Sequence, residues 1–311
     1  TAFPDYWGGW KDNQIDVFRT IVVSDSATQV QMLCSGEVDK LQIPITEYMD
    51  QIKAANNVQV LTANSLQSNI FTFNMQKFPF NNKLVREAVS LAFDYQAAVD
   101  IVYGGYATIP SGFMSTNWEE HNPDIPQQTQ NMEKAKELIA QSGVGDCTIN
   151  IHLCEGSNDQ LLMAQILQGN LAELGITLNI KVVPWTSMAE EQLSPDTAPE
   201  MSALNMGAFT GDAVYYMETN FGTGGVYNWS FFFDADFVAC IRDARSTTNE
   251  AQRTADLYKA QQIVVDNCAA LWCVSPDSVE VISNRINGFV IHPLDYYYSI
   301  RPYLLTAGNK R

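Results

Sequence analysis

The sequence is poor in basic residues. Its 311 residues include 18 lysines and arginines against 35 aspartates and glutamates, so the formal net charge is −17. A nucleic-acid-binding protein neutralises phosphates with a cationic surface, and anionic membranes attract basic segments, so this balance argues against both partners. The simplest interpretation of the acidity is that it keeps the protein soluble.

Motifs for metal binding and catalysis are also missing. The only histidines, His121, His152 and His292, show no ligand spacing, and no two cysteines form a C-x-x-C pair. The chain contains no H-E-x-x-H, no G-x-S-x-G and no P-loop lysine motif. The glycine-rich residues 222–226 lack the strand-to-helix context of a phosphate loop. We therefore expect no catalytic residue, no metal and no cofactor.

Long apolar runs are absent as well, so we expect no membrane-spanning segment. The first residues, TAFPDYWGGW, have neither a basic region nor an apolar core, so no signal peptide is expected within them. The six cysteines leave two alternatives open. Cys240 and Cys268 lie in successive helical patterns and would form a disulfide if those helices pack antiparallel; otherwise the cysteines are buried free thiols.

Helical and strand patterns alternate along the chain, which indicates an α/β fold. Residues 15–23 read as a strand. Strand-like residues 148–153 and 176–183 flank a helical pattern at residues 158–174, which predicts a βαβ unit with parallel strands. Gly175 is expected to end that helix in the left-handed conformation.

The most abrupt change of pattern lies at residues 71–94. Apolar and polar residues alternate at first, and then, from Leu84, apolar residues follow the spacing of a helix that Asn81 or Asn82 would cap. Within one domain this would be an ordinary strand-to-helix loop. The alternative is a crossing between two lobes.

Several stretches, in order, resemble the family 5 extracellular solute-binding proteins. These are peptide-type receptors of ABC importers, and the family also includes dipeptide, nickel and glycoside binders. The stretches are PDYWGGWKDNQIDVFRTIV, VQMLCSGEVDKL, FNMQKFPFNNKLVREAVSLAFDYQAAV, EKAKELIAQSG, LQGNLAELGITLNIKVV, EAQRTADLYKAQQIVVDN and RINGFVIHP. Together they cover nearly the whole chain, and the third is the most specific.

The resemblance implies a periplasmic-binding-protein-like α/β fold of type II, peptide-binding class. It further implies a partial first lobe at residues 1–75, a complete α/β lobe at 76–285 and a return segment at 286–311. The two interlobe crossings would lie at residues 72–81 and 282–292. Family members usually carry a large N-terminal part ahead of the Tyr-Trp-Gly motif found here at residues 6–8, so we expect a fragment.

By the same resemblance, the protein is an extracytoplasmic receptor, in the periplasm or lipid-anchored at the outer face of the cytoplasmic membrane. It would capture a peptide-like solute between two lobes, close around it by hinge motion and present it to the permease of an ABC importer, without catalysis. A sugar or a nickel or other metal chelate as the ligand, and a hydrolase, are the alternatives. Ligand identity and peptide length stay open.

Candidate ligand contacts come mainly from aromatic residues, which make up 11% of the chain and suit the apolar wall of a small-ligand site. Those in loop-like segments are Phe113, Trp118, Trp185, Phe209, Tyr215, Tyr216, Tyr227 and Trp229. Trp185 follows Pro184 at the carboxyl end of a predicted strand, the edge at which α/β sheets bind ligands.

The resemblance adds one charged candidate. In the peptide-binding branch an Asp after a small residue holds the α-ammonium of the ligand, which points here to Asp212 after Gly211. The alternative role for Asp212 is to cap the helix that follows it. The complete predicted ligand-binding set is Asp212, Phe209, Trp185, Trp229, Asn228 and Tyr215.

Overall fold

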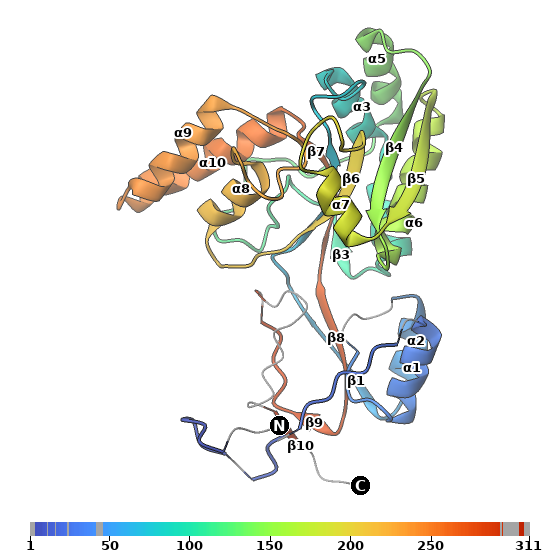
Figure 1. Cartoon of the computed structure of the whole chain (residues 1–311), viewed down its shortest axis with the longest axis vertical. Coiled ribbons are helices and arrows are strands. Elements are labelled where there is room, and N and C mark those ends of the chain that lie inside the picture. Colours follow the sequence, from blue (N-terminus) through green and yellow to red (C-terminus); the bar gives the residue numbers. More distant parts are fainter. Residues whose placement is uncertain are drawn as a thin grey trace. The chain divides into compact units, whose positions relative to one another are not determined.

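The computed structural model describes residues 4–10, 12–15, 17–23, 25–41, 46–292, 294 and 305–307. The chain forms two compact units (Figure 1). Unit 1 comprises Thr1–Asn64 and Asp277–Arg311, and unit 2 comprises Ser65–Pro276. The chain therefore passes from one unit to the other twice, after Asn64 and after Pro276.

Unit 2 is built on a six-stranded mixed sheet with the strand order β3-β7-β2-β6-β4-β5. In chain order, its strands are β2 (Ser68–Phe73), β3 (Ala107–Thr108), β4 (Cys147–Cys154), β5 (Ile176–Val183), β6 (Met201–Met206) and β7 (Ala270–Pro276). β4 runs parallel to β5 and to β6, whereas β2 is antiparallel to both β6 and β7. The sheet is thus parallel on the β5 side and antiparallel on the β3 side.

The predicted βαβ unit is confirmed. β4 and β5 pair in parallel, with Cys147 opposite Ile176, and α6 (Asn158–Ala172) connects them. Gly175 has a φ of +74°, so it adopts the left-handed conformation that the sequence predicts just after this helix.

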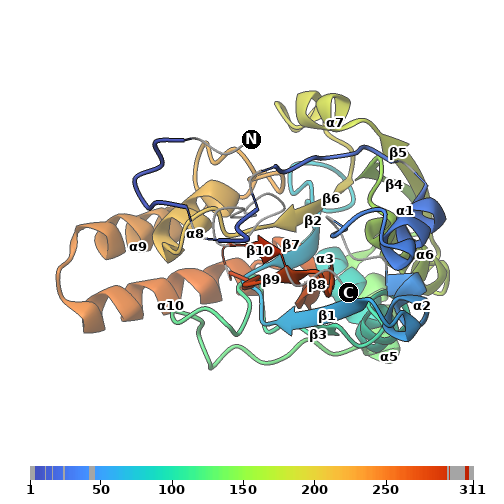
Figure 2. The same cartoon turned by 90° about the horizontal axis from the view of Figure 1, so that it is seen from below.

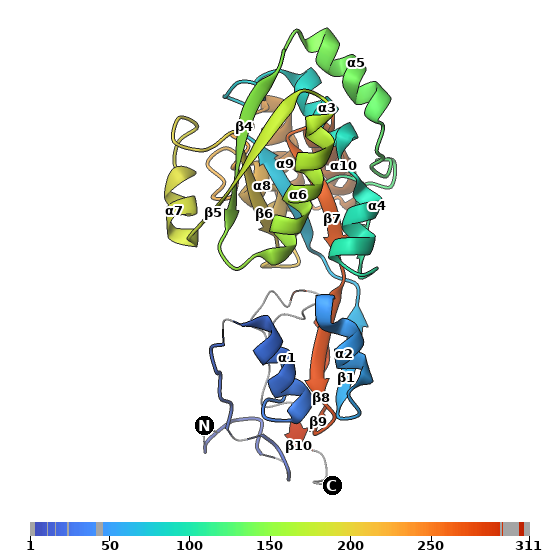
Figure 3. The same ribbon diagram turned by 90° about the vertical axis from the view of Figure 1, so that its right-hand side faces the viewer.

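Helices pack on both faces of the sheet. The core on one face includes Phe71, Ile151 and Leu167, and it is formed with α3 (Lys83–Ala92), α4 (Tyr95–Ala97), the π-helical turn η2 (Ala98–Val102), α5 (Met132–Ser142) and α6. The remaining helices are α7 (Trp185–Glu191), α8 (Ala213–Phe221), α9 (Ala235–Ser246) and α10 (Glu250–Asp266). α7 lies on the opposite side of β5 from α6 (Figure 3), and α9 and α10 lie side by side (Figure 1, Figure 2).

On the face opposite Phe71, aromatic side chains form a second core. Trp272 of β7 packs against Phe113 and Phe221 with ring centroids 5.8 and 5.9 Å apart, and Trp118 packs against Tyr216 at 4.9 Å. The sequence analysis includes Phe113, Trp118 and Tyr216 among the aromatic residues of loop-like segments. In the structure all three are buried in this core.

Unit 1 contains smaller elements. They are α1 (Ser26–Ser35), η1 (Thr46–Tyr48), α2 (Met49–Ala54), β1 (Val58–Ala63), β8 (Ser278–Ser283), β9 (Ile286–Asn287) and β10 (Thr306–Ala307). β1 pairs with β8 and β9 with β10, each antiparallel. Val30, Leu33 and Ile52 of the two helices are fully buried.

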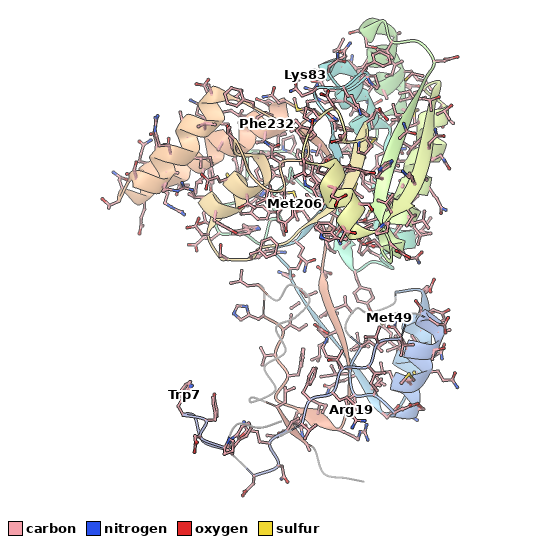
Figure 4. All side chains as sticks on the ribbon, viewed as in Figure 1. Trp7, Arg19, Met49, Lys83, Met206 and Phe232 are labelled. Carbon is pink, nitrogen blue, oxygen red and sulfur yellow. The ribbon has the colours of Figure 1, made fainter. Side chains whose placement is uncertain are left out.

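The strand expected at residues 15–23 is not formed over its described residues, 15 and 17–23. A strand needs a partner backbone. The Ile15 N–H donates to the Leu305 carbonyl oxygen at 3.1 Å, but among the described residues no strand pairs with the segment at residues 17–23. Its apolar side chains are consequently exposed, Val22 to 93%. Trp7, labelled in Figure 4, is exposed to 91%.

The structure divides the chain at 64/65 and 276/277, whereas the sequence analysis expects boundaries at 75/76 and 285/286. The physical reason is strand pairing. β2 is hydrogen-bonded on one side to β6 and on the other to β7, so it is a central strand of unit 2. β8 pairs with β1 inside unit 1. Of the two expected crossings, residues 72–81 therefore lie within unit 2 and residues 282–292 within unit 1.

Cysteine and membrane predictions can be compared directly with the structure. All six cysteines lie in the described part of the chain and all are free thiols, so the Cys240–Cys268 disulfide is absent. Among the described residues, every helix is too short or too polar to cross a bilayer.

The abrupt change from strand to helix has a local cause. The Asn82 side chain accepts a hydrogen bond from the Leu84 backbone N–H at 3.0 Å and caps α3, so Asn82 rather than Asn81 is the cap. The rings of Phe73 and Phe80 stack at 4.6 Å, which brings the end of β2 onto the start of the helical segment.

Arg86 of α3 is buried, with only 4% of its surface exposed. Its guanidinium donates hydrogen bonds to the carbonyl oxygens of Phe80 (2.7 Å), Asn267 (2.8 Å) and Cys268 (3.2 Å). Burial lowers the pKa of this guanidinium from its ordinary value. Two of the acceptors follow the last residue of α10, where unsatisfied carbonyls carry partial negative charge. Arg86 thus joins α3 to the end of α10.

We expect Arg86→Met to destabilise the protein by about 3 kcal/mol, because it leaves several buried carbonyl oxygens without a donor. The matched control is Lys83→Met on the same helix. Lys83 is half-exposed and, within the described part of the chain, forms an ion pair with Glu87 alone, at 3.3 Å, so its loss should cost less than about 0.5 kcal/mol. Urea denaturation measures both. Equal effects would show that the buried hydrogen bonds of Arg86 do not matter.

Candidate ligand-binding site

The carboxyl ends of three strands meet at one edge of the unit 2 sheet. β4, β5 and β6 are mutually parallel, so the chain leaves all three at this edge. Trp185 follows β5, and Phe209 and Asp212 follow Met206, the last residue of β6, which is labelled in Figure 4. In open α/β sheets this is the edge at which ligands bind.

Four aromatic residues form a continuous series of ring contacts, which we call the aromatic row: Phe209, Tyr227, Trp229 and Trp185. Neighbouring ring centroids are separated by 5.9, 6.3 and 5.6 Å along the row. Its two ends are half-exposed, Phe209 to 49% and Trp185 to 46%, whereas Trp229 is buried. Trp229 thus anchors the row in the protein, while Phe209 and Trp185 expose part of their rings to solvent. Such exposed aromatic rings suit contact with apolar ligand groups.

The row joins three of the predicted residues, Phe209, Trp185 and Trp229. The fourth member, Tyr227, belongs to the loop aromatics but not to the predicted set. Its role depends on a ring contact with Phe209, far away in sequence, which no local pattern indicates.

Asn228 lies in the same loop but its amide faces the protein backbone. Its Nδ2 donates to the carbonyl oxygens of Phe232 (2.8 Å) and Gly222 (3.1 Å), and its Oδ1 accepts from the Phe232 N–H at 3.1 Å. Phe232 is labelled in Figure 4. The geometry therefore makes Asn228 a residue that shapes the loop under the aromatic row.

The glycine-rich residues 222–226 pack tightly against the end of α8. A Cβ on Gly222 would approach the Glu218 carbonyl oxygen to 2.5 Å, and one on Gly225 would approach that of Thr219 to 2.6 Å. The loop therefore faces helix carbonyl oxygens, which repel anions. This agrees with the expectation that the stretch is no phosphate loop.

Asp212 is the N-cap of α8. Its carboxylate accepts a hydrogen bond from the Tyr215 N–H at 2.7 Å, and its Oδ2 lies 3.8 Å from Nη2 of Arg253. The Asp212 side chain is still 55% exposed. Asp212 and Tyr215 line a surface hollow of about 330 Å³ together with Val214, Ala244, Arg245, Thr247 and Arg253. Asp212 therefore caps α8, which is the alternative role considered in the sequence analysis. Its carboxylate is also exposed enough to contact a ligand.

A larger hollow, of about 560 Å³, lies at the opposite edge of the sheet, at the amino ends of β4 and β5. Cys147, Gly175 and Ile176 are among its lining residues, and none of the six predicted ligand residues is. Size alone does not identify a site, and the chemistry of the carboxyl edge makes that edge the better candidate.

The histidines are dispersed in the structure. His152 of β4 pairs with Glu191 of α7, with 2.6 Å between Nδ1 and Oε2, while His121 contacts the Met114 carbonyl oxygen at 3.1 Å. Within the described ranges, no group of three or more His, Cys, Asp or Glu side chains is arranged to hold a metal ion.

Comparison with known proteins gives concordant matches. The model of the family described as bacterial extracellular solute-binding proteins, family 5 middle, matches residues 1–228. The chain is 26% identical over 309 residues to heme-binding protein A of Haemophilus influenzae. It is 28% identical over 304 residues to di/tripeptide-binding protein 4 of Pseudomonas aeruginosa. These alignments cover 95% and 94% of this chain but 54% and 56% of the relatives. The chain therefore spans about half the length of the curated relatives it matches.

A solved structure shows the same fold. The periplasmic binding protein DppA of Helicobacter pylori, determined in complex with the peptide STSA, superposes with a TM-score of 0.84 and 22% identity. The superposition covers 92% of this chain and 56% of that one. The predicted type II periplasmic-binding-protein fold is confirmed.

We expect Asn228→Ala to lower stability by about 2 kcal/mol, because buried backbone groups of the loop lose their hydrogen-bond partners. Asn179→Ala, at an exposed position of β5, is the control and should change stability by less than about 0.5 kcal/mol. Thermal unfolding of both variants measures this. If Asn228→Ala were as stable as wild type, its amide would not shape the loop and would be available to a ligand.

Proposed function

Because the chain belongs to the bacterial extracellular solute-binding proteins of family 5, we propose that the intact protein captures a peptide-like solute outside the cytoplasm and delivers it to the permease of an ABC importer. The receptor acts in the periplasm or at the outer face of the membrane, where a lipid anchor holds it. Closure of two lobes around the ligand is part of this proposal. No bond of the solute is made or broken.

The aromatic row carries the proposal. A receptor for peptides of varied sequence must bind apolar side chains without demanding one shape, and half-exposed aromatic rings supply such a surface at low entropic cost. The row lies at the sheet edge expected for ligand binding, and its buried member Trp229 packs against the exposed ring of Trp185. The name of the Pseudomonas aeruginosa relative, a di/tripeptide-binding protein, supports the same ligand class.

The relatives differ in what their names say they bind, since the Haemophilus influenzae protein is named for heme. Heme iron is usually held by histidine, cysteine or methionine, and occasionally by tyrosine. Of the four residues of the aromatic row, only Tyr227 is of such a type. The row therefore favours a peptide over heme as the ligand.

Native mass spectrometry of the intact protein purified without refolding tests the function. The expected result is one or more co-purified species with peptide masses that are released on denaturation. Heme, an oligosaccharide or a nickel chelate as the released species would replace the peptide. Catalytic turnover of an added tripeptide, followed in the same spectra, would contradict a pure receptor.

Asp212 is proposed to bind the α-ammonium of the peptide, as the family resemblance implies. Asp212→Asn preserves the acceptor for the Tyr215 N–H, so the helix cap is retained while the charge is lost. We expect the affinity for trialanine, measured by calorimetry, to fall at least about thirtyfold. N-acetyl-trialanine, which has no ammonium, is the control ligand and should bind both proteins alike. Equal trialanine affinities would leave Asp212 as a cap and a partner of Arg253.

A further inference from the structure

A second group of side chains lies at the carboxyl edge of unit 2 and contains none of the predicted ligand residues. We call it the polar cluster, and it comprises Asn69, Tyr103, Asp159, Gln160 and Asn205. Asn69 and Asn205 are directly opposite each other on β2 and β6, and Asp159 and Gln160 lie in the first turn of α6. Tyr103 directly follows η2.

Hydrogen bonds join Asn69, Tyr103 and Asp159 to one another, and Gln160 to Asn205. Oδ2 of Asp159 accepts from the Tyr103 hydroxyl at 2.7 Å and from Nδ2 of Asn69 at 3.3 Å. The Asn69 amide also donates to the Tyr103 oxygen. Nε2 of Gln160 donates to Oδ1 of Asn205 at 2.9 Å. These bonds orient the Asp159 carboxylate and the three amides.

The carboxylate of Asp159 has only neutral neighbours in these contacts. No ion pair within the described ranges includes Asp159. Burial, reinforced by Asp159, raises the pKa of the Tyr103 phenol well above its usual range, so the hydroxyl remains a donor at neutral pH. Asp159 itself is half-buried, so part of this residue is exposed to solvent.

Among the residues that the structure describes, two buried acceptors of the cluster have no hydrogen-bond partner. They are Oδ1 of Asn69 and Oε1 of Gln160, whose side chains belong to residues only 3% and 4% exposed. Their amide nitrogens are already used inside the cluster, so the orientation of both oxygens is set. Buried acceptors normally have a partner. Both residues adjoin Asp159, because the Asn69 amide donates to its carboxylate and Gln160 follows it in the chain.

This donor-poor arrangement matches one chemical group well. A primary ammonium has three N–H donors and no acceptor, and the cluster contains a carboxylate without an ion-pair partner and two amide oxygens without a donor among the described residues. Ammonium and carboxylate form a charge-assisted hydrogen bond, which low polarity strengthens. A divalent metal fits less well, because the cluster has a single carboxylate whose Oδ2 already receives an O–H and an N–H.

We propose that the polar cluster is a subsite for a second primary ammonium of the ligand, that of a lysine side chain, with Asp159 as its anchor. This inference rests on the proposed peptide-binding function and assigns a preference within it. It is separate from the α-ammonium contact of Asp212, which lies beside Arg253 and caps α8.

The test is calorimetry on the intact protein with two matched sets of alanine tripeptides. One set carries lysine at the first, second or third position, and the other carries norleucine, which keeps the aliphatic stem and lacks the charge. At one position the lysine peptide should bind at least about tenfold more tightly than its norleucine partner. This comparison uses wild-type protein, so it does not depend on whether a variant folds.

Variants then locate the effect. Asp159→Asn should abolish the lysine preference while the norleucine peptides bind as before, and Asp212→Asn should weaken all six peptides yet keep the preference. A wild-type protein that binds the peptides without any lysine preference would overturn the inference and leave the peptide function standing. The same holds if Asp159→Asn lowers the melting temperature but retains the preference, because the cluster would then be a structural brace. Failure of all six peptides to bind would overturn both proposals.

Discussion

The hydrogen bonds of Arg86 decide how unit 2 is assembled. α3 follows β2 and α10 precedes β7, and β2 and β7 are neighbours in the sheet. A buried helix end needs donors for its last carbonyl oxygens, and a guanidinium supplies several in one plane. By joining α3 to the residues after α10, Arg86 fixes the two helices that leave and enter adjacent strands. These contacts lie at the end of β2 and the start of β7, which is the edge of the sheet opposite the candidate site.

The register of β2 on β7 directly affects the edge of the sheet that carries the candidate site. The pairing of these strands is irregular between Asn69 and Ile70, and such bulges re-aim side chains. Asn69 is the residue whose amide contacts Tyr103 and Asp159. The edge thus carries two chemically different surfaces, the apolar aromatic row beside α7 and the oxygen-rich polar cluster beside α6. A ligand that has both apolar and cationic groups would use both.

Local patterns in the sequence account for much of the fold. The parallel unit β4-α6-β5 follows from periodicity and from Gly175, because all its determinants lie within forty or so residues. The unit boundaries could not be predicted in this way, since β2 is placed by pairing with strands far along the chain. Phe71, for instance, lies opposite both Ala203 and Leu271.

The candidate site shows the same division. Trp185 was predictable because it directly follows a strand, and its contact with Trp229 brings two predicted residues together. The role of Asn228 was not predictable, because its partners are backbone carbonyls that no residue type reveals. The polar cluster was missed for a related reason, since Asn69, Asp159 and Asn205 are brought together by sheet order alone.

The six free thiols have a consequence for chemical labelling of the protein. Burial raises the pKa of every one of them, so at neutral pH they are protonated and poor nucleophiles. The described part of the chain is therefore held together without a disulfide. Maleimide labelling of these thiols in the native protein is expected to be slow compared with labelling of a thiol introduced on the surface.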